Sequence, residues 1–406
     1  LAAWSATGPV AVGRALLRNS TGAASAVVVG AQVADLANAT GSNNTLIGSR
    51  VLRSVTSGAD VTAIGSDVFP TATATNELSA VGSRIADLGG ALVGSARLFA
   101  FGRDLLRNAT GGSDTLALGY RLADLAAYAG SNNTLIGFSL ARGLTTGNDN
   151  TLVGNALFSG AGGTLSGAVA FGRQVADLAV PSGAANLGVG TSLLRSLTTG
   201  ASNTAVGNSL FDTGTPLTGS SNTAIGFQSL RAVTSGSSNT AVGAAVFPTL
   251  SNASNTTGAG ARIADLSAGF TGAGVTAVGA DLLRDATTLT DSVAVGRRLA
   301  DSATVTAAGL ALVGVDLARG ATGALDLALV GSRLVDLGAA VTAQRVAAVG
   351  QDALRAVTSA TDLAAVGSVI GNAATGSAAR WAALGQQLLV ASTGAQQVVA
   401  AGYQCL

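Results

Sequence analysis

The sequence predicts an all-β fold, a β-solenoid (β-helix) that winds through about 23 short rungs. Three observations support this fold class. A glycine preceded by an aliphatic or aromatic residue recurs every 17 to 20 residues, an apolar residue returns three positions later, and Arg and Asp alternate five positions later. The 22 intervals between Gly13 and Gly402 cover 389 residues, a mean of 17.7. Fixed self-similarity on this scale is typical of repeat architectures.

A longer repeat lies above the rung. The glycines Gly13, Gly102, Gly190, Gly279 and Gly367 are 89, 88, 89 and 88 residues apart, so five rungs form a super-repeat of 88–89 residues. Because the pattern continues without a change of composition, we expect residues 1–406 to form a single continuous β-solenoid with no separate domains.

Each rung begins with a short strand and continues into a turn. Segments such as 204–207 (TAVG) are rich in residues that favour strands. Segments such as 234–238 (TSGSS) have the composition of turns. The third residue after each glycine is almost always apolar, and we expect this column to point inward. It begins with Leu16, Val33, Val51, Val68, Ile85, Leu105, Leu122, Leu140, Leu157 and Val175.

At the fifth position after most of the glycines, Arg and Asp alternate, and Pro70, Ser159 and Pro248 occupy this position in three rungs. This structural charge ladder comprises Arg18, Asp35, Arg53, Asp87, Arg107, Asp124, Arg142, Asp177, Arg195, Asp212, Arg231, Asp265, Arg284, Asp301, Arg319, Asp336 and Arg355. A slip by one rung would place Arg beside Arg, so we interpret the ladder as a device that fixes the register of the stack. The alternative is ordinary solvated charges, worth about 0.2 to 1 kcal/mol per pair.

A second charged column lies two residues after the glycine and also alternates, in two separate runs. Its members are Arg50, Asp67, Arg84, Asp104 and Arg121, and then Arg262, Asp281, Arg298, Asp316, Arg333 and Asp352. Since both charged columns alternate in sign, we expect most of the charge to be neutralised within the stack.

Composition excludes several partners. Hydrophobic residues make up 48% and charged residues 11% of the chain, which indicates a folded core rather than disorder. Polar residues interrupt every apolar stretch before the roughly 20 residues that a spanning helix needs, so we expect no membrane span. The net charge is +1 and the Arg residues alternate with Asp, whereas a nucleic-acid partner would require an uncompensated basic stripe.

The residue types that perform catalysis are mostly missing. There is no His, which removes Ser-His-Asp and Cys-His arrangements and His metal sites, and one Cys cannot form a thiolate metal cluster. A paired-Asp active site on one face of the solenoid stays open, but the Asp residues recur at repeat positions instead of converging from different elements. We expect no enzyme activity, no cofactor and no metal.

Seven Asn-x-Ser/Thr sequons occur, at Asn19, Asn38, Asn43, Asn108, Asn132, Asn252 and Asn255. They are candidate N-glycosylation sites if the protein is secreted by a cell that glycosylates asparagine. In a chain rich in Ser and Thr, some sequons are expected by chance.

The Asn-rich rungs resemble a known class of repeats. Segments 42–48 (SNNTLIG), 131–137 (SNNTLIG) and 221–230 (SNTAIGFQSL) are similar to the Asn-Thr-Ala-Ile-Gly repeats of bacteriophage tail fibres and related surface fibres. They are more distantly similar to the heads of trimeric autotransporter adhesins. The resemblance implies an extracellular, cell-surface or virion-surface fibre, often a homotrimer. The Arg/Asp rungs depart from the family pattern.

The sequence therefore predicts a non-catalytic structural subunit of an extracellular or virion-surface filament, which self-assembles end to end and whose partners are copies of itself. One alternative is an adhesin that binds surface glycans. Another is an ice-binding solenoid, although most rungs offer one Thr before the glycine and Ala beside it.

Overall fold

The computed structural model describes residues 10–16, 23–33, 41–51, 57–68, 74–85, 93–106, 113–123, 129–159, 161–176, 182–212, 215–263, 274–282, 288–290, 293–297, 306–308, 311, 313–315, 325–328, 330–332, 342–351, 359–364, 366–368, 378–382, 384–386, 396–399 and 401–404. Every regular element within these ranges is a β-strand, and the strands pair in parallel between successive coils. The predicted fold class, an all-β solenoid, is confirmed.

The chain divides into two compact units, Leu1–Asn203 and Thr204–Leu406. We describe each unit by itself. The prediction of a single continuous solenoid over residues 1–406 therefore stays a prediction.

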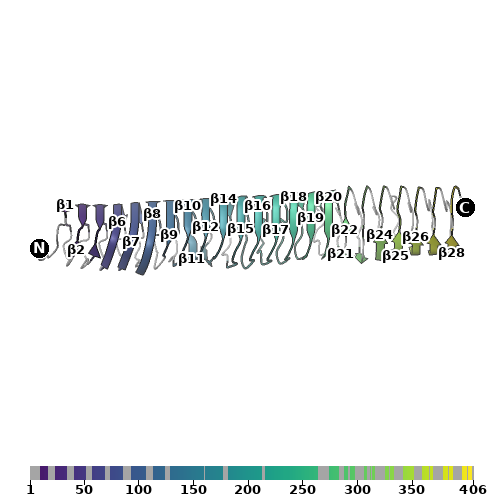
Figure 1. Cartoon of the computed structure of the whole chain (residues 1–406), viewed down its shortest axis with the longest axis horizontal. Coiled ribbons are helices and arrows are strands. Elements are labelled where there is room, and N and C mark those ends of the chain that lie inside the picture. The colour runs from purple at the N-terminus through teal and green to yellow at the C-terminus, as the bar shows by residue number, and fades with distance from the viewer. Residues whose placement is uncertain are drawn as a thin grey trace. The chain divides into compact units, whose positions relative to one another are not determined.

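Unit 1 contains fifteen described strands, most of which stand side by side in Figure 1. They are β1 (Val10–Arg14), β2 (Ala23–Ala24), β3 (Val27–Ala31), β4 (Gly41–Ser42), β5 (Thr45–Ser49), β6 (Ser57–Val68), β7 (Ala74–Ile85), β8 (Val93–Arg103), β9 (Thr115–Tyr120), β10 (Thr134–Phe138), β11 (Gly143–Thr146), β12 (Thr151–Asn155), β13 (Ala161–Thr164), β14 (Val169–Val175) and β15 (Leu187–Leu193).

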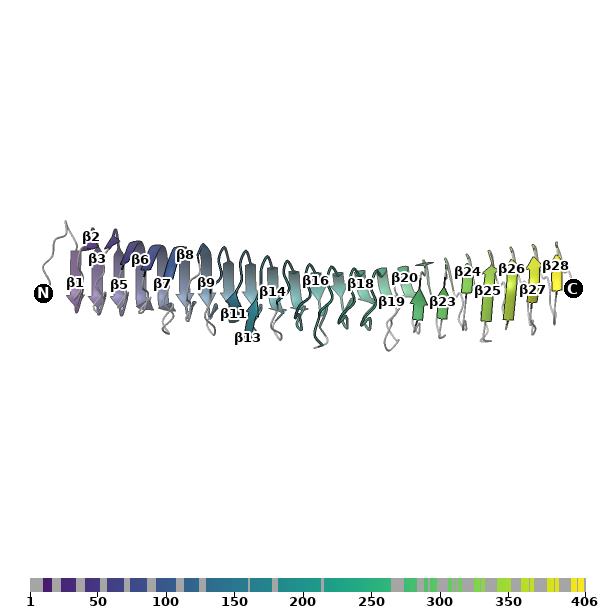
Figure 2. The same cartoon turned by 90° about the horizontal axis from the view of Figure 1, so that it is seen from below.

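Unit 2 contains thirteen described strands, which Figure 2 shows from a second direction. They are β16 (Thr204–Asn208), β17 (Thr223–Phe227), β18 (Thr240–Val246), β19 (Thr257–Ile263), β20 (Thr276–Leu282), β21 (Thr288–Thr290), β22 (Val293–Ala294), β23 (Thr306–Ala308), β24 (Leu325–Ala328), β25 (Thr342–Ala347), β26 (Ser359–Ala364), β27 (Ala378–Ala382) and β28 (Gln396–Val399).

The number of rungs in the main sheet differs from the predicted number. Within the described ranges the main parallel sheet has 17 strands, fewer than the expected 23 or so rungs, and β22 is its last strand in chain order. The strands β21 and β23 to β28 form a separate seven-stranded sheet. The glycine repeat continues through this part of the chain, but the strands there occupy a different part of the rung.

Glycine pairs with glycine in the main sheet. Gly137 of β10 lies opposite Gly119 of β9 on one side and Gly154 of β12 on the other, and the residues before it pair in the same register. Each repeat of the sequence therefore corresponds to one coil of the solenoid, as predicted.

The core is formed by alternation along each strand. In β10, Leu135 is buried, whereas Thr134 and Ile136 on either side are more exposed. The residue three positions after the glycine also points inward. In the coil of Gly102 this residue is Leu105, and its two neighbours, Asp104 (φ 56°) and Leu106 (φ 47°), adopt left-handed backbone conformations that turn the chain at this point.

The predicted inward column is confirmed except at its first member. Val33, Val51, Val68, Ile85, Leu105, Leu122, Leu140, Leu157 and Val175 are all 0% exposed, while Leu16 is half-buried. Alanine or glycine is common two residues before the anchor because the interior is narrow. A Cβ on Gly188 would lie 2.6 Å from Val175 Cγ1 of the preceding coil.

Buried asparagines stack between coils and satisfy backbone groups inside the core. Asn150 Nδ2 donates to Asn133 Oδ1 (2.9 Å) and to the carbonyl oxygen of Leu165 (2.8 Å), and Asn150 Oδ1 accepts from the amide of Ala168 (2.9 Å). In unit 2, Asn239 Nδ2 donates to Asn222 Oδ1 (3.0 Å), and Thr256 donates to Asn239 Oδ1 (2.6 Å). Because buried polar groups are costly without partners, these ladders hold successive coils in one register.

Candidate functional site

The most distinctive surface of the molecule is the outward side of the coils around the repeat glycines, which up to β22 is the outward side of the main sheet. We call it the outer face and define it as the residues three before, one before and one after each repeat glycine. In β10 these are Thr134, Ile136 and Phe138. They point away from the core because strand side chains alternate between the two sides of a sheet.

The outer face carries an exposed apolar column. The residue just before the repeat glycine is 36 to 59% exposed at Val12, Ile47, Phe101, Phe171 and Val189 in unit 1, and at Ile225, Val242, Val278, Val295, Val313, Val330, Val349, Val366 and Leu384 in unit 2. Single exposed apolar residues are ordinary, but a contiguous apolar patch marks an interaction surface.

Aromatic side chains enlarge this column on β8 to β10. Phe99 and Phe101 are 48% and 54% exposed. The rings of Tyr120 and Phe138, on neighbouring coils, stack with centroids 5.2 Å apart and an interplanar angle of 24°. The guanidinium of Arg103 lies 5.7 Å from the centroid of the Tyr120 ring, within cation–π range. Aromatic residues and Arg are enriched at protein interfaces.

The column two residues after the glycine forms the ion pairs that its alternation predicted. Arg50 pairs with Asp67 (2.5 Å), Arg84 with Asp104 (2.6 Å) and Arg262 with Asp281 (2.6 Å), in each case across neighbouring coils. Arg298, Asp316, Arg333 and Asp352 of this column lie outside the described residues.

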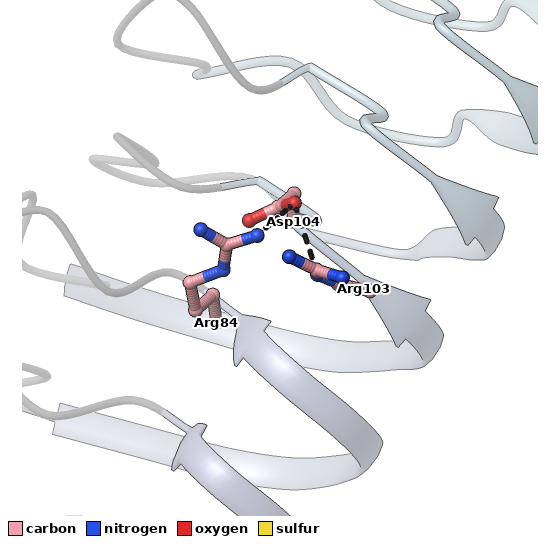
Figure 3. A network of polar contacts seen from close by, with 3 residues as sticks. All are labelled: Arg84, Arg103 and Asp104. Carbon is pink, nitrogen blue, oxygen red and sulfur yellow. Dashed lines mark hydrogen bonds and ion pairs between the residues drawn. The ribbon is translucent and has the colours of Figure 1, made fainter.

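One of these pairs is more buried than the others. Figure 3 shows Arg84 and Arg103 converging on Asp104, whose side chain is 5% exposed. Arg103 Nε lies 3.5 Å from Asp104 Oδ2. The charge of this nearly buried carboxylate is therefore compensated by two guanidinium groups.

The sequence reasoning missed another polar column, five residues before the glycine. Arg97 pairs with Asp114 (2.5 Å), Asn43 Nδ2 donates to Asp60 Oδ1 (3.0 Å), and Asn132 Nδ2 donates to Asp149 Oδ1 (3.0 Å). All six side chains belong to residues with left-handed backbone conformations. Counting back from each glycine would have revealed this column.

Most of the predicted charge ladder belongs to parts of the chain that the structure does not describe. Arg18, Asp35, Arg53, Asp87, Arg107, Asp124, Asp177, Asp265, Arg284, Asp301, Arg319, Asp336 and Arg355 lie outside the described residues. Arg142, Arg195 and Asp212 are half-buried and Arg231 is exposed. The backbone amide of Asp212 donates to the carbonyl oxygen of Arg231 (3.0 Å), so these two ladder positions lie on adjacent coils. The role of the ladder in register stays a prediction.

Four of the seven sequons fall within the described residues. Asn43, Asn132, Asn252 and Asn255 are exposed, and three of them, Asn43, Asn132 and Asn255, occupy the same left-handed turn position. Asn19, Asn38 and Asn108 lie outside the described residues. Glycosylation stays a prediction.

No metal site emerges within the described ranges, where no three Cys, Asp or Glu side chains gather closely enough to hold an ion. The same ranges contain no apolar helix of bilayer-spanning length.

From the sequence, the residues of the outer face were identified only in part. The aliphatic residue before each glycine was recognised as a strand residue, but its direction was not assigned. The sequence did contain a signal for this direction. Ala commonly stands two residues before the glycine, and if this small residue faces the narrow core, the residues on either side of it in the strand must point outward.

Comparison with family models, curated proteins and solved structures finds no match to this chain.

Proposed function

We propose that this protein is a structural subunit of an extracellular or virion-surface filament, without catalytic activity, that assembles from copies of itself. The observation that carries the proposal is the apolar outer face, which repeats with the coil spacing along both units. A partner that covers such a face along its length needs the same spacing, and a second copy of the chain has it.

Two modes of assembly fit this architecture. The outer face favours lateral contact between stacks. The parallel pairing between coils favours end-to-end growth. The last coil of a stack offers the same backbone donors and acceptors as every other coil. Unpaired strand edges of this kind are templates for further strands. The resemblance of the Asn-rich rungs to fibre repeats supports the same function.

The test is the association of purified protein, measured by sedimentation velocity over a range of concentrations and by negative-stain imaging. We expect oligomers or filaments for the wild type. The double variant Val242→Asp/Val278→Asp places two charges on the outer face of unit 2 and should shift the distribution to monomer with an unchanged circular dichroism spectrum. Ser238→Asp, an exposed position outside the outer face, is the matched control and should assemble as the wild type does.

A wild-type protein that stays monomeric at every concentration would contradict the proposal. In that case the exposed rings of Phe99, Phe101 and Phe138 favour the alternative, an adhesin whose aromatic residues stack on glycans. A monomer retained on immobilised polysaccharide, and released by substitution of Phe101, would establish that alternative.

A further inference from the structure

The outer face of unit 1 has an abrupt change in side-chain size between β7 and β8, which we call the step. On β7 the three outward residues are small: Ser79, Val81 and Ser83. On β8 their register partners are large: Phe99, Phe101 and Arg103. The step falls where one five-rung super-repeat meets the next, between Gly82 and Gly102.

The change in size persists on both sides of the step. The residue after the glycine is small in the four coils before it, namely Ala31, Ser49, Ser66 and Ser83. In the five coils after it, the equivalent residues are Arg103, Tyr120, Phe138, Asn155 and Arg173. In this column unit 1 thus presents small residues in the four coils before the step and larger ones in the coils after it.

We propose that two copies pair through this face with their stacks antiparallel, about a two-fold axis that runs along the strands between β7 and β8. The inference rests on the proposed function, because it requires association through the outer face. A two-fold interface must be self-complementary, and a step with one low and one high half is self-complementary under this rotation.

The rotation places large side chains over small ones. Val81 of one copy lies opposite Phe101 of the second copy. Ile64 lies opposite Leu118 of the second copy, and these two side chains are equal in size. In the neighbouring column, Ser66 faces Tyr120 of the second copy and Ser49 faces its Phe138. In an in-register parallel pairing the bulky residues of β8 to β10 would instead meet their own copies, while the small residues of β5 to β7 would leave a gap.

Charge follows the same symmetry in the column two residues after the glycine. The rotation brings Arg84 level with Asp104 of the second copy and Asp67 level with Arg121 of the second copy. Arg84 and Asp104 already form a pair within one chain, so the second copy extends it into a network of four charges. A like-charged match occurs one residue after the glycine, where Arg14 meets Arg173 of the second copy. It falls at the outer limit of the face, where solvent screens it.

The face is large enough for a specific dimer. Ten strands from β1 to β14, at about 4.8 Å each, give a length of about 48 Å, and five residues per strand at about 3.3 Å give a width of about 16 Å. The product, about 770 Å² per copy, is close to the roughly 800 Å² per partner of standard protein interfaces.

Site-specific crosslinking tests the inference in the full chain, with Cys405 replaced by Ser. Ile64→Cys and Leu118→Cys are prepared as separate variants, and a short bismaleimide is added to each alone and to their mixture. In the proposed dimer, Ile64 faces Leu118 of the second copy, whereas the two Ile64 residues are offset sideways by three strand spacings, about 14 Å. The two sheets should lie about 10 Å apart, within reach of the reagent. We expect crosslinked dimer in the mixture and none in either variant alone. Ile47→Cys with Ile136→Cys, on β5 and β10, is a second, independent pair for which the same result is expected.

The outcomes separate this inference from the proposed function. Dimers in each single variant, with no excess in the mixture, would show parallel pairing, and oligomers without any crosslink at either pair would place the contact elsewhere. Both results overturn the two-fold step and leave self-assembly standing. A Cys405→Ser parent that sediments only as monomer would overturn both.

Discussion

The coils up to Gly279 and those from Gly296 onward carry the same glycine in different backbone conformations. The repeat glycines from Gly13 to Gly279 have φ between 121° and 146°. In this region a Cβ at the repeat glycines whose surroundings are described would lie 1.7 to 2.5 Å from a carbonyl oxygen of the next coil. From Gly296 to Gly385 no repeat glycine has φ in the left-handed range, and a Cβ added at any of them would lie 3.3 to 3.9 Å from its nearest neighbour.

A difference three residues before the glycine accompanies this change. That position is Thr at Thr45, Thr62, Thr134, Thr151, Thr204, Thr223, Thr240, Thr257 and Thr276, and the strand continues from it through the glycine. It is Ala at Ala328, Ala347, Ala364 and Ala382, and there the strand ends at the Ala. Thr favours strands more than Ala does, which agrees with the direction of the difference at these positions, while β28 also ends three residues before its glycine, at Val399.

The comparison teaches that one repeat motif can be required for two reasons. In the first region glycine is required by backbone geometry and close approach. In the second region the space around the glycine accommodates a side chain. The recurrence of glycine there is therefore not explained by a close approach to the carbonyl oxygen of the next coil.

Replacing the glycine in each region should give the largest contrast. Gly243→Ala puts Cβ 1.7 Å from the carbonyl oxygen of Gly260 at φ +135°, so we expect a loss above about 4 kcal/mol, or failure to fold. Gly350→Ala puts Cβ 3.5 Å from the nearest atom and should be neutral or stabilise by up to about 1 kcal/mol. Both residues belong to unit 2, and urea unfolding followed by circular dichroism measures both. Equal losses at the two sites would remove the distinction between the regions.

Removing a buried asparagine should have the next largest effect. Asn239→Ala removes the donor to Asn222 Oδ1 and to the carbonyl oxygen of Ala253, and the acceptor of the Thr256 amide. Since each buried group left without a partner costs about 1 to 3 kcal/mol, we expect a loss of about 3 kcal/mol or more in the same assay.

The control is an exposed asparagine in the same unit. Asn255→Gly keeps a left-handed backbone that glycine adopts freely (φ 58°), and we expect a change within about 0.5 kcal/mol. A similar small change at Asn239 would mean that the asparagine stack does not hold the coils together.

The fold could be predicted from the sequence because one period governs the whole chain. The spacing of glycines gave the coil, and the apolar column beginning at Leu16 gave the core, because a residue that returns once per coil occupies the same place in each coil. The predicted number of about 23 rungs differs from the 17 strands of the main sheet in the described residues, since the glycine column does not show which residues around it form the strand.

The outer face could not be predicted in full, for a physical reason. Val, Ile and Phe before the glycine have the composition of a core, and only the direction of the side chain separates a buried column from an exposed one. Along the strand, that direction follows from alternation only once one column is known to be buried. The buried column three residues after the glycine depends in turn on left-handed residues such as Arg121 and Ala123, whose types do not identify them as turn positions. The stacking of the Tyr120 and Phe138 rings depends on the same side-chain directions, so the sequence did not predict it.

Exchanging Thr and Ala before the glycine should have the smallest effect and test the cause of the regional difference. Ala347 is exposed at the end of β25, so Ala347→Thr should extend that strand toward Gly350 and stabilise it by less than about 1 kcal/mol. Hydrogen exchange of the peptide that contains Gly350 should slow by up to about fivefold, the equivalent of about 1 kcal/mol. Thr240→Ala should speed exchange around Gly243 by a similar factor.

Ala348→Thr is the control, because Ala348 is 2% exposed and a larger side chain there should destabilise the coil. If Ala347→Thr left exchange around Gly350 unchanged while Thr240→Ala raised it around Gly243, strand propensity would not explain why the two regions differ.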